Sequence, residues 1–179
     1  MVLSRFGNDN DFKIKANPST QEFFGRNVRV AVMGDYPTLT DLDIAYGKDF
    51  ASEWLLPHIT DLSAHTGAKN LSLQQIDSLA RIIATEYRHL KITEILLFFY
   101  RFKAGHYGRF YGSVDPMVIT CSFREFMDER NSLIDRFTQE DYERRLYEDL
   151  NNPDNMSREE FKEIKMLTRM YEMIIPNRQ

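Results

Sequence analysis

The segment from Ile95 to Gly112 constrains this chain most strongly, because its eighteen residues include no acidic side chain. It opens with six consecutive apolar residues, Ile95 to Tyr100, and continues into a stretch that is basic, aromatic and contains three glycines. A helix that is apolar on nearly every side belongs in the interior of a fold. We therefore predict a central helix over about 93–103, followed by a tight connection.

Three N-capping signatures, each followed by a helical stripe of apolar residues, predict further helices. Their first residues are Ser72, Asp115 and Ser157. The second signature places a proline, Pro116, at the first helical position, where its missing N–H costs nothing. The helix after Pro116 is long and either runs to Leu150 or restarts near residue 138. The polar stretch over 151–154 should end it.

Glycine and proline punctuate the first third of the chain as well. A helix should start after Pro37 and end at Gly47, a position that suits a residue with positive φ. The next helix covers about 48–65, with Pro57 either kinking or splitting it. Residues 23–33 contain the alternating valines of a strand, but a lone strand has nothing to pair with, so we predict a helix there.

Together these patterns predict a mainly α fold, a compact multi-helix bundle. A hydrophobic content of 42% supports a real core, and the 28% charged residues of both signs indicate a globular chain. We divide the 179 residues into three parts. Residues 1–20 form a polar lead-in that could be disordered, and residues 21–150 form the helical core domain. Residues 151–179 form a C-terminal helix that packs on the core or serves association.

Composition also limits the classes of function. The net charge of −4 argues against a nonspecific coat on duplex DNA, which carries a large positive excess. A single cysteine, Cys121, allows no intramolecular disulfide, which fits a reducing compartment, and we expect it to be buried as a small hydrophobe. The longest apolar run is far shorter than the roughly 20 residues that span a bilayer. We expect a cytoplasmic protein that does not enter membranes.

The sequence gives little support for a metal site or a phosphate site. Glu86 and His89 form the single Glu-x-x-His motif, whereas a di-iron bundle needs two copies. His58 and His65 are about two helical turns apart, too far for one ion. The glycines after residue 104 are followed by no Gly-Lys-Ser/Thr, and the next helix opens with the anion Asp115. We therefore predict no metal, no cofactor and no catalytic residue, so the protein is not expected to be an enzyme.

The basic and aromatic segment is the remaining candidate site. Single-stranded nucleic acid is held by rings that stack on bases and by cations that meet the backbone, and this segment offers both. The alternative is that the rings pack in the core and the glycines close a turn with positive φ. Aromatic residues between buried helices usually pack, so packing is the more economical interpretation. The candidate residues are Arg101, Lys103, His106, Tyr107, Arg109, Phe110 and Tyr111.

The C-terminal third has a different character and suggests a protein partner. Between Arg124 and Lys165 there are thirteen acidic and eight basic residues. The last helix contains Met166, Met170 and Met173. Methionine-rich helical faces adapt to partners, although they also fill cores. The helix could therefore fold back on the body, capture another protein or join two copies of the chain.

The stretch from Trp54 to about Ile134 resembles a family of uncharacterised proteins carried on phage and conjugative elements of gut anaerobes. The resemblance rests on Leu90 to Ile95, Phe98 to Gly112, Asp115 to Ile119 and Phe123 to Arg130. The family has no established activity, so no site residue is transferred from it. Its helical layout is loosely similar to the small helical loaders that place replicative helicases on phage DNA, a likeness of fold alone.

We therefore expect a non-enzymatic accessory protein of a mobile element or phage, with a role in DNA replication. Its partner would be a protein such as a replicative helicase, with single-stranded nucleic acid as a second partner. The alternative is a structural or regulatory adaptor that binds only protein. The sequence leaves homo-oligomerisation open.

Overall fold

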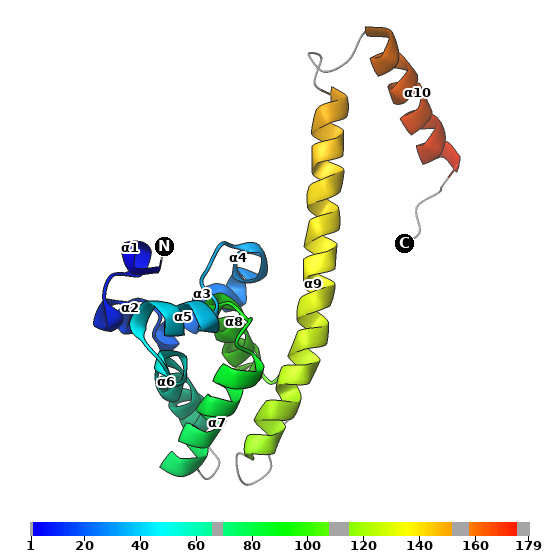
Figure 1. The fold of residues 1–179 in the computed structure, drawn as a ribbon. Coiled ribbons are helices and arrows are strands. Elements are labelled where there is room, and N and C mark those ends of the chain that lie inside the picture. The colour runs from blue at the N-terminus through cyan, green and yellow to red at the C-terminus, as the bar shows by residue number, and fades with distance from the viewer. Residues whose placement is uncertain (1, 66–69, 108–114, 152–157, 175–179) are drawn as a thin grey trace. The chain divides into compact units, whose positions relative to one another are not determined.

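A computed structural model describes residues 2–65, 70–107, 115–151 and 158–174 (Figure 1). These residues are almost entirely helical; they contain no strand, and Thr38 and Lys91 form an isolated antiparallel bridge. The predicted mainly α fold is thus confirmed. The chain forms two compact units, Met1–Ile134 and Asp135–Gln179, and the division between them falls within a helix.

Short connections link the first six α-helices. The longest helix lies in the C-terminal part of the chain. In chain order the helices are α1 (Val2–Phe6), α2 (Asp9–Lys15), the 3-10 helix η1 (Pro18–Thr20), α3 (Gln21–Arg26), α4 (Val28–Met33), α5 (Leu39–Tyr46), α6 (Phe50–His65), α7 (Leu73–Glu86), α8 (Ile92–Lys103), α9 (Pro116–Asn151) and α10 (Arg158–Ile174).

The segment expected as a polar lead-in instead forms helices α1 and α2. Asn8 and Asp11 cap α2 reciprocally, with backbone to side-chain hydrogen bonds of 3.0 and 3.3 Å. Phe12 is fully buried, and its ring contacts four other aromatic rings with centroids 5.3 to 6.0 Å away. Those rings belong to Phe6, Tyr46, Phe50 and Trp54. One buried phenylalanine and one capping box therefore order a segment whose composition is polar.

Side chains of α5 and α6 also hold this segment by its backbone. The Tyr46 hydroxyl donates a hydrogen bond to the carbonyl oxygen of Gly7 at 3.1 Å. Trp54 Nε1 and His58 Nε2 both reach the carbonyl oxygen of Ala16, at 2.7 and 3.1 Å. Because the acceptors are backbone oxygens, the sequence of the N-terminal segment gives little sign of this attachment.

The predicted helix boundaries at α5 and α7 are confirmed. Thr38 caps α5, and α5 ends at Gly47, whose φ is +113°. The predicted box at Ser72 forms with Gln75: the Ser72 N–H donates to Gln75 Oε1 at 2.9 Å, and the Gln75 N–H donates to Ser72 Oγ at 3.3 Å. Between them, α6 continues through Pro57 as one helix of 16 residues.

Residues 23–33 are helical, as predicted, but they form two short helices, α3 and α4, that meet at Asn27. Gly25 in α3 lets this part approach α8 closely. A Cβ atom on Gly25 would lie 2.1 Å from a ring carbon of Tyr100. Figure 1 shows α3 and α4 beside α8, and α3 and α8 are in extensive contact.

α8 is the central helix of the first unit, as its sequence predicts. Of its twelve residues, all but Tyr100 and Lys103 are buried. Its ring stack continues into the first part of α9, where Phe98 and Phe123 lie 3.7 Å apart between centroids and nearly parallel. Ile119 and Phe126 of α9 are also fully buried.

α9 runs without a break from Pro116 to Asn151, so it does not restart near residue 138. Asp115 caps it, accepting a hydrogen bond from the Met117 N–H at 2.8 Å. The part of α9 in the second unit is polar on most sides and contains pairs one turn apart. Arg136 lies 3.7 Å from Glu140, for example. Such pairs stabilise a solvated helix by a few tenths of a kcal/mol, about 0.3 each. α10 starts at Arg158, and its predicted cap Ser157 lies outside the described residues.

Candidate functional site around the end of α8

The end of α8 explains the first glycine of the basic and aromatic segment. The Gly105 N–H donates to the carbonyl oxygen of Phe102 at 3.0 Å, and the His106 N–H donates to that of Arg101 at 3.1 Å. This pair of bonds is the Schellman pattern, which needs a residue in the left-handed region after the helix. Gly105 supplies it with a φ of +81°. The structure thus assigns Gly105 a role in ending the helix.

Arg101 is buried and paired within the fold. Its Nη1 lies 2.6 Å from Oε2 of Glu129 on α9, an ion pair without a well-aligned hydrogen bond. The Arg101 side chain is 10% exposed, whereas that of Glu129 is 38% exposed. A guanidinium that is largely desolvated and already neutralised has little left to offer a phosphate.

Tyr107 packs back on the core. Its ring lies 5.6 Å from that of Phe98 between centroids, tilted by 20°. Its hydroxyl points toward Glu129, with a distance of 3.5 Å between the oxygens. Burial, and after it the charge of Glu129, raises the pKa of the Tyr107 phenol well above its usual value. The phenol therefore stays protonated at neutral pH and is available as a hydrogen-bond donor.

Lys103 has its own partner on a different helix. Its Nζ lies 2.7 Å from Oδ2 of Asp61 on α6. This pair lines a groove of about 580 Å³ near the ends of α6 and α8. The other residues of the groove are Pro18, Ser19, Glu22, His65, Tyr100 and Ala104. The groove combines both signs of charge and therefore offers no strong preference for an anion.

The remaining candidate residues divide into one that is described and three that are not. His106 is exposed just after α8 ends. Arg109, Phe110 and Tyr111 lie outside the described residues. The structure therefore brings Arg101 and Tyr107 together around Glu129 and places Lys103 with Asp61. Whether the segment binds nucleic acid stays a prediction.

A second charged pair between α8 and α9 has no counterpart in the predicted site. Glu94 is fully buried, and its Oε1 accepts a hydrogen bond from Arg130 Nε at 2.8 Å. Its other oxygen accepts from the backbone N–H of Lys91 at 2.8 Å and so caps α8. The sequence holds a signal for this pair, because Arg130 falls on the apolar stripe that includes Phe123 and Phe126. An arginine in such a stripe needs a buried anion.

Cys121 is exposed, so the expectation of a buried cysteine is wrong. The physical reason is its register on α9, since a helix turns by about 100° per residue. Phe123 and Ile119 are buried, and Cys121, two residues from each, falls on the other side of the helix. Within the described ranges, no three His, Cys, Asp or Glu side chains are grouped so that they could hold a metal ion.

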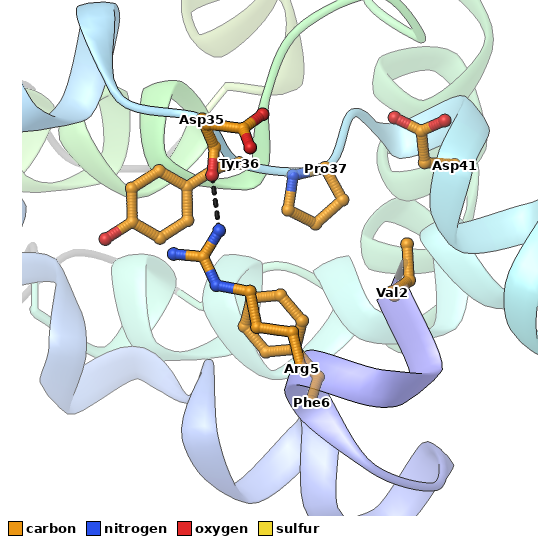
Figure 2. Close-up of a pocket in the computed structure, with 7 residues that line it drawn as sticks. All are labelled: Val2, Arg5, Phe6, Asp35, Tyr36, Pro37 and Asp41. Atoms are coloured by element: carbon orange, nitrogen blue, oxygen red, sulfur yellow. Dashed lines mark hydrogen bonds between the residues drawn. The ribbon is translucent and has the colours of Figure 1, made fainter.

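A small pocket in the first unit lies between α1 and the link from α4 to α5 (Figure 2). The Arg5 guanidinium donates a hydrogen bond to the carbonyl oxygen of Asp35 and lies 4.5 Å from the centre of the Tyr36 ring. Val2, Pro37 and Asp41 line the other side. Its volume is about 120 Å³, below the range of roughly 300–1,000 Å³ that is usual for ligand pockets. These contacts attach α1 to the rest of the unit.

Large apolar side chains are exposed along the second unit. On α9 they are Tyr142, Leu146 and Tyr147, which are 61%, 46% and 69% exposed. On α10 they are Met166, Leu167 and Met170, which are 59%, 59% and 47% exposed. In the described part of the chain, none of the helices combines the length and apolar character that crossing a bilayer requires.

Comparison with known proteins places the second half of this chain in a family. Residues 70–171 match a family of unknown function, DUF6633. The chain belongs to this family. No curated protein and no solved structure matches the chain.

The DUF6633 region begins just before the cap of α7 and ends within α10. It therefore contains α7, α8, all of α9 and both ion pairs between α8 and α9. Helices α1 to α6, with the aromatic cluster around Phe12, lie before it. The family match thus includes Arg101, Lys103, Glu94 and the exposed apolar side chains of the second unit, but it assigns no activity to them.

Proposed function

We propose that this protein is a non-enzymatic accessory protein that acts as an adaptor, binding another protein through the second unit. The observation that carries the proposal is a contrast between two groups of residues. Arg101 and Lys103 of the candidate segment are ion-paired within the fold, and Tyr107 packs on Phe98. By contrast, large apolar side chains of the second unit are exposed.

The chemistry of these exposed side chains suits a protein partner. Tyrosine and methionine are enriched at protein interfaces, whereas charged residues are depleted at interface cores. Tyr142 and Tyr147 provide large rings with a polar end, and Met166 and Met170 provide flexible side chains that adapt to a partner. The intervening ion pairs would keep the helix soluble while it is unbound.

We further propose a cytoplasmic setting in a phage or mobile element, with a component of the DNA replication machinery as the partner. The support is the sequence resemblance over Trp54 to Ile134, together with the loose likeness in helical layout to helicase loaders. The second candidate function is binding of single strands by the segment after α8. It draws on the exposed His106 and on the basic and aromatic residues 109–111.

The test compares two triple variants in a binding assay with a replicative helicase as the partner. The first variant changes Tyr142, Leu146 and Tyr147 to serine. The control changes three exposed apolar residues of the first unit, Leu3, Ile14 and Ile44, to serine. If the adaptor proposal holds, the first variant should bind at least about tenfold more weakly, a loss of about 1.4 kcal/mol, and the control should bind as before.

The same preparations would be titrated with labelled single-stranded oligonucleotides at low salt. Salt-sensitive binding that is lost on Arg109→Ala and retained in the Tyr142, Leu146 and Tyr147 variant would favour the second candidate. Equal helicase binding by both triple variants would reject the second unit as the binding surface.

A further inference from the structure

A buried polar cluster joins the end of α2 to α3 and α6. His58 of α6 is fully buried, and Gln21 at the start of α3 is 1% exposed. Gln21 Nε2 lies 2.9 Å from His58 Nδ1, and His58 Nε2 lies 3.1 Å from the carbonyl oxygen of Ala16. Trp54 Nε1 donates to the same carbonyl oxygen at 2.7 Å.

These partners fix the protonation state of the imidazole. The carbonyl oxygen of Ala16 only accepts, so His58 Nε2 must carry a hydrogen. The amide nitrogen of Gln21 only donates, so His58 Nδ1 must be the bare acceptor. The arrangement therefore belongs to the neutral Nε2–H tautomer. Burial lowers the pKa of His58 to about 4, which agrees with this state at neutral pH.

The side-chain amide of Gln21 uses only its nitrogen in this cluster. Gln21 Oε1 is buried and has no hydrogen-bond partner. A proton on His58 Nδ1 would face the amide N–H group and be repelled by it. A half-turn of the amide would instead present Oε1 to that proton. Both nitrogens of the imidazolium would then meet an oxygen acceptor.

The charged groups around the cluster offset each other, so accommodation of a proton on His58 Nδ1 depends on the Gln21 amide. Those that act on His58 are Asp61 of α6 and Lys103 of α8, which have opposite effects. They are also paired with each other at 2.7 Å. The groups that touch the imidazole from the α2 end and from α3 are the Ala16 carbonyl and the Gln21 amide, and both are uncharged.

We propose that Gln21 and His58 form a proton-dependent clasp, in which the Gln21 amide turns over when His58 takes up a proton. The turn would replace an N–H donor by an oxygen acceptor and leave the His58 bond to Ala16 intact. The N-terminal segment would then stay attached to α6 in both states. The unsatisfied oxygen of Gln21 is the reserve acceptor on which the second state depends.

Long-range ¹H–¹⁵N spectra of the imidazoles in the full-length protein test this clasp. At pH 7 the His58 signals should show a protonated Nε2 and a bare Nδ1. As the pH falls, the Gln21 side-chain amide signals should shift with the same midpoint as those of His58. A protonated Nδ1 with a bare Nε2 at pH 7 would overturn the assignment, and so would a Gln21 amide that does not follow the titration.

Two variants of Gln21 should shift the His58 titration midpoint in opposite directions. Gln21→Glu supplies an acceptor at both positions and a negative charge, so the His58 midpoint should rise by at least about one pH unit. Gln21→Leu removes the reserve acceptor, so the midpoint should fall. An unchanged midpoint in both variants would reject the clasp.

Attachment of the segment needs a separate readout in the wild-type protein. Cross-relaxation between the rings of Phe12 and Trp54, whose centroids lie 6.0 Å apart, should persist below the His58 midpoint. Its loss in step with the titration would show that protonation releases the segment, and the two-state clasp would be wrong.

Discussion

At the scale of single residues, Glu94 has the most demanding position in the first unit. Its carboxylate is fully buried and holds two donors, the Lys91 backbone N–H and the Arg130 guanidinium. A buried carboxylate is tolerated only when its oxygens are paired or hydrogen-bonded. Loss of either Glu94 or Arg130 therefore leaves the charge of the other without compensation.

We predict that Glu94→Ala lowers the free energy of unfolding by about 3 kcal/mol, because it removes the cap of α8 and isolates Arg130. Urea denaturation followed by circular dichroism measures the change. The double variant Glu94→Leu with Arg130→Met should recover part of the loss, since no buried charge is left unpaired. Simple addition of the two single effects in the double variant would contradict a direct pair.

His58 makes stability depend on pH. Its pKa is about 4 in the folded protein, against 6.5 in an unfolded chain, so the unfolded state binds more protons between these values. The contribution of His58 to the free energy of unfolding is fully present above about pH 6.5. It decreases as the pH drops toward 4 and is constant at lower pH. The whole span amounts to about 3 kcal/mol.

Urea midpoints measured between pH 7 and pH 4 should therefore fall, and fall less steeply in His58→Gln, which does not titrate. Carboxylates contribute in the lower part of this range, so the difference between the two proteins is the relevant quantity. Parallel curves for the two proteins would show that His58 does not contribute.

At the scale of helices, two glycines of the first unit are required for different reasons. Gly105 has a φ of +81° and open space around its Cα, so Gly105→Ala should cost about 1 kcal/mol in backbone strain alone. Gly25 is helical, but a Cβ atom added to it would lie 2.1 Å from the Tyr100 ring, so Gly25→Ala requires that ring or the helices to shift.

We predict that Gly25→Ala destabilises the first unit more than Gly105→Ala does. In a thermal denaturation series, Tyr100→Ala should relieve most of the Gly25→Ala penalty and none of the Gly105→Ala penalty. Equal relief of both penalties would mean that the contact between α3 and α8 is not the cause.

The same scale separates what the sequence can predict from what it cannot. The caps at Ser72 and Asp115 and the end of α5 at Gly47 depend on neighbours within a few residues, and each prediction is confirmed. The order of the N-terminal helices depends on Phe12 meeting rings of α5 and α6 about forty residues away, which no local pattern reveals.

The candidate site shows the same limit. Its residue types suit single-strand binding, yet Arg101 and Lys103 pair with acidic residues of α9 and α6, namely Glu129 and Asp61. Helical periodicity places an arginine on a face of its helix but does not indicate which acidic residue of another helix it will meet. Local sequence therefore identifies the segment and leaves its partners undetermined.

At the scale of the whole molecule, one helix belongs to both units. The division after Ile134 falls inside α9, whose fully buried phenylalanines, Phe123 and Phe126, lie in its first half. The hydrophobic core of the described residues is almost entirely before the division, and Phe137 is the buried side chain just after it. The first unit therefore has the core that an independent fold requires.

We predict that a chain ending after residue 137 keeps the fold of the first unit, since it retains α1 to α8, both ion pairs from α8 to α9 and Phe137. Its near-ultraviolet circular dichroism should match that of the full chain, and its thermal midpoint should fall by no more than a few degrees. Its binding to the protein partner should be lost. A matched chain ending after residue 151 keeps Tyr142, Leu146 and Tyr147 and tests whether α10 is needed as well.

Loss of cooperative unfolding in the shorter chain would show that the second unit belongs to the core. Full partner binding by the shorter chain would place the interface in the first unit.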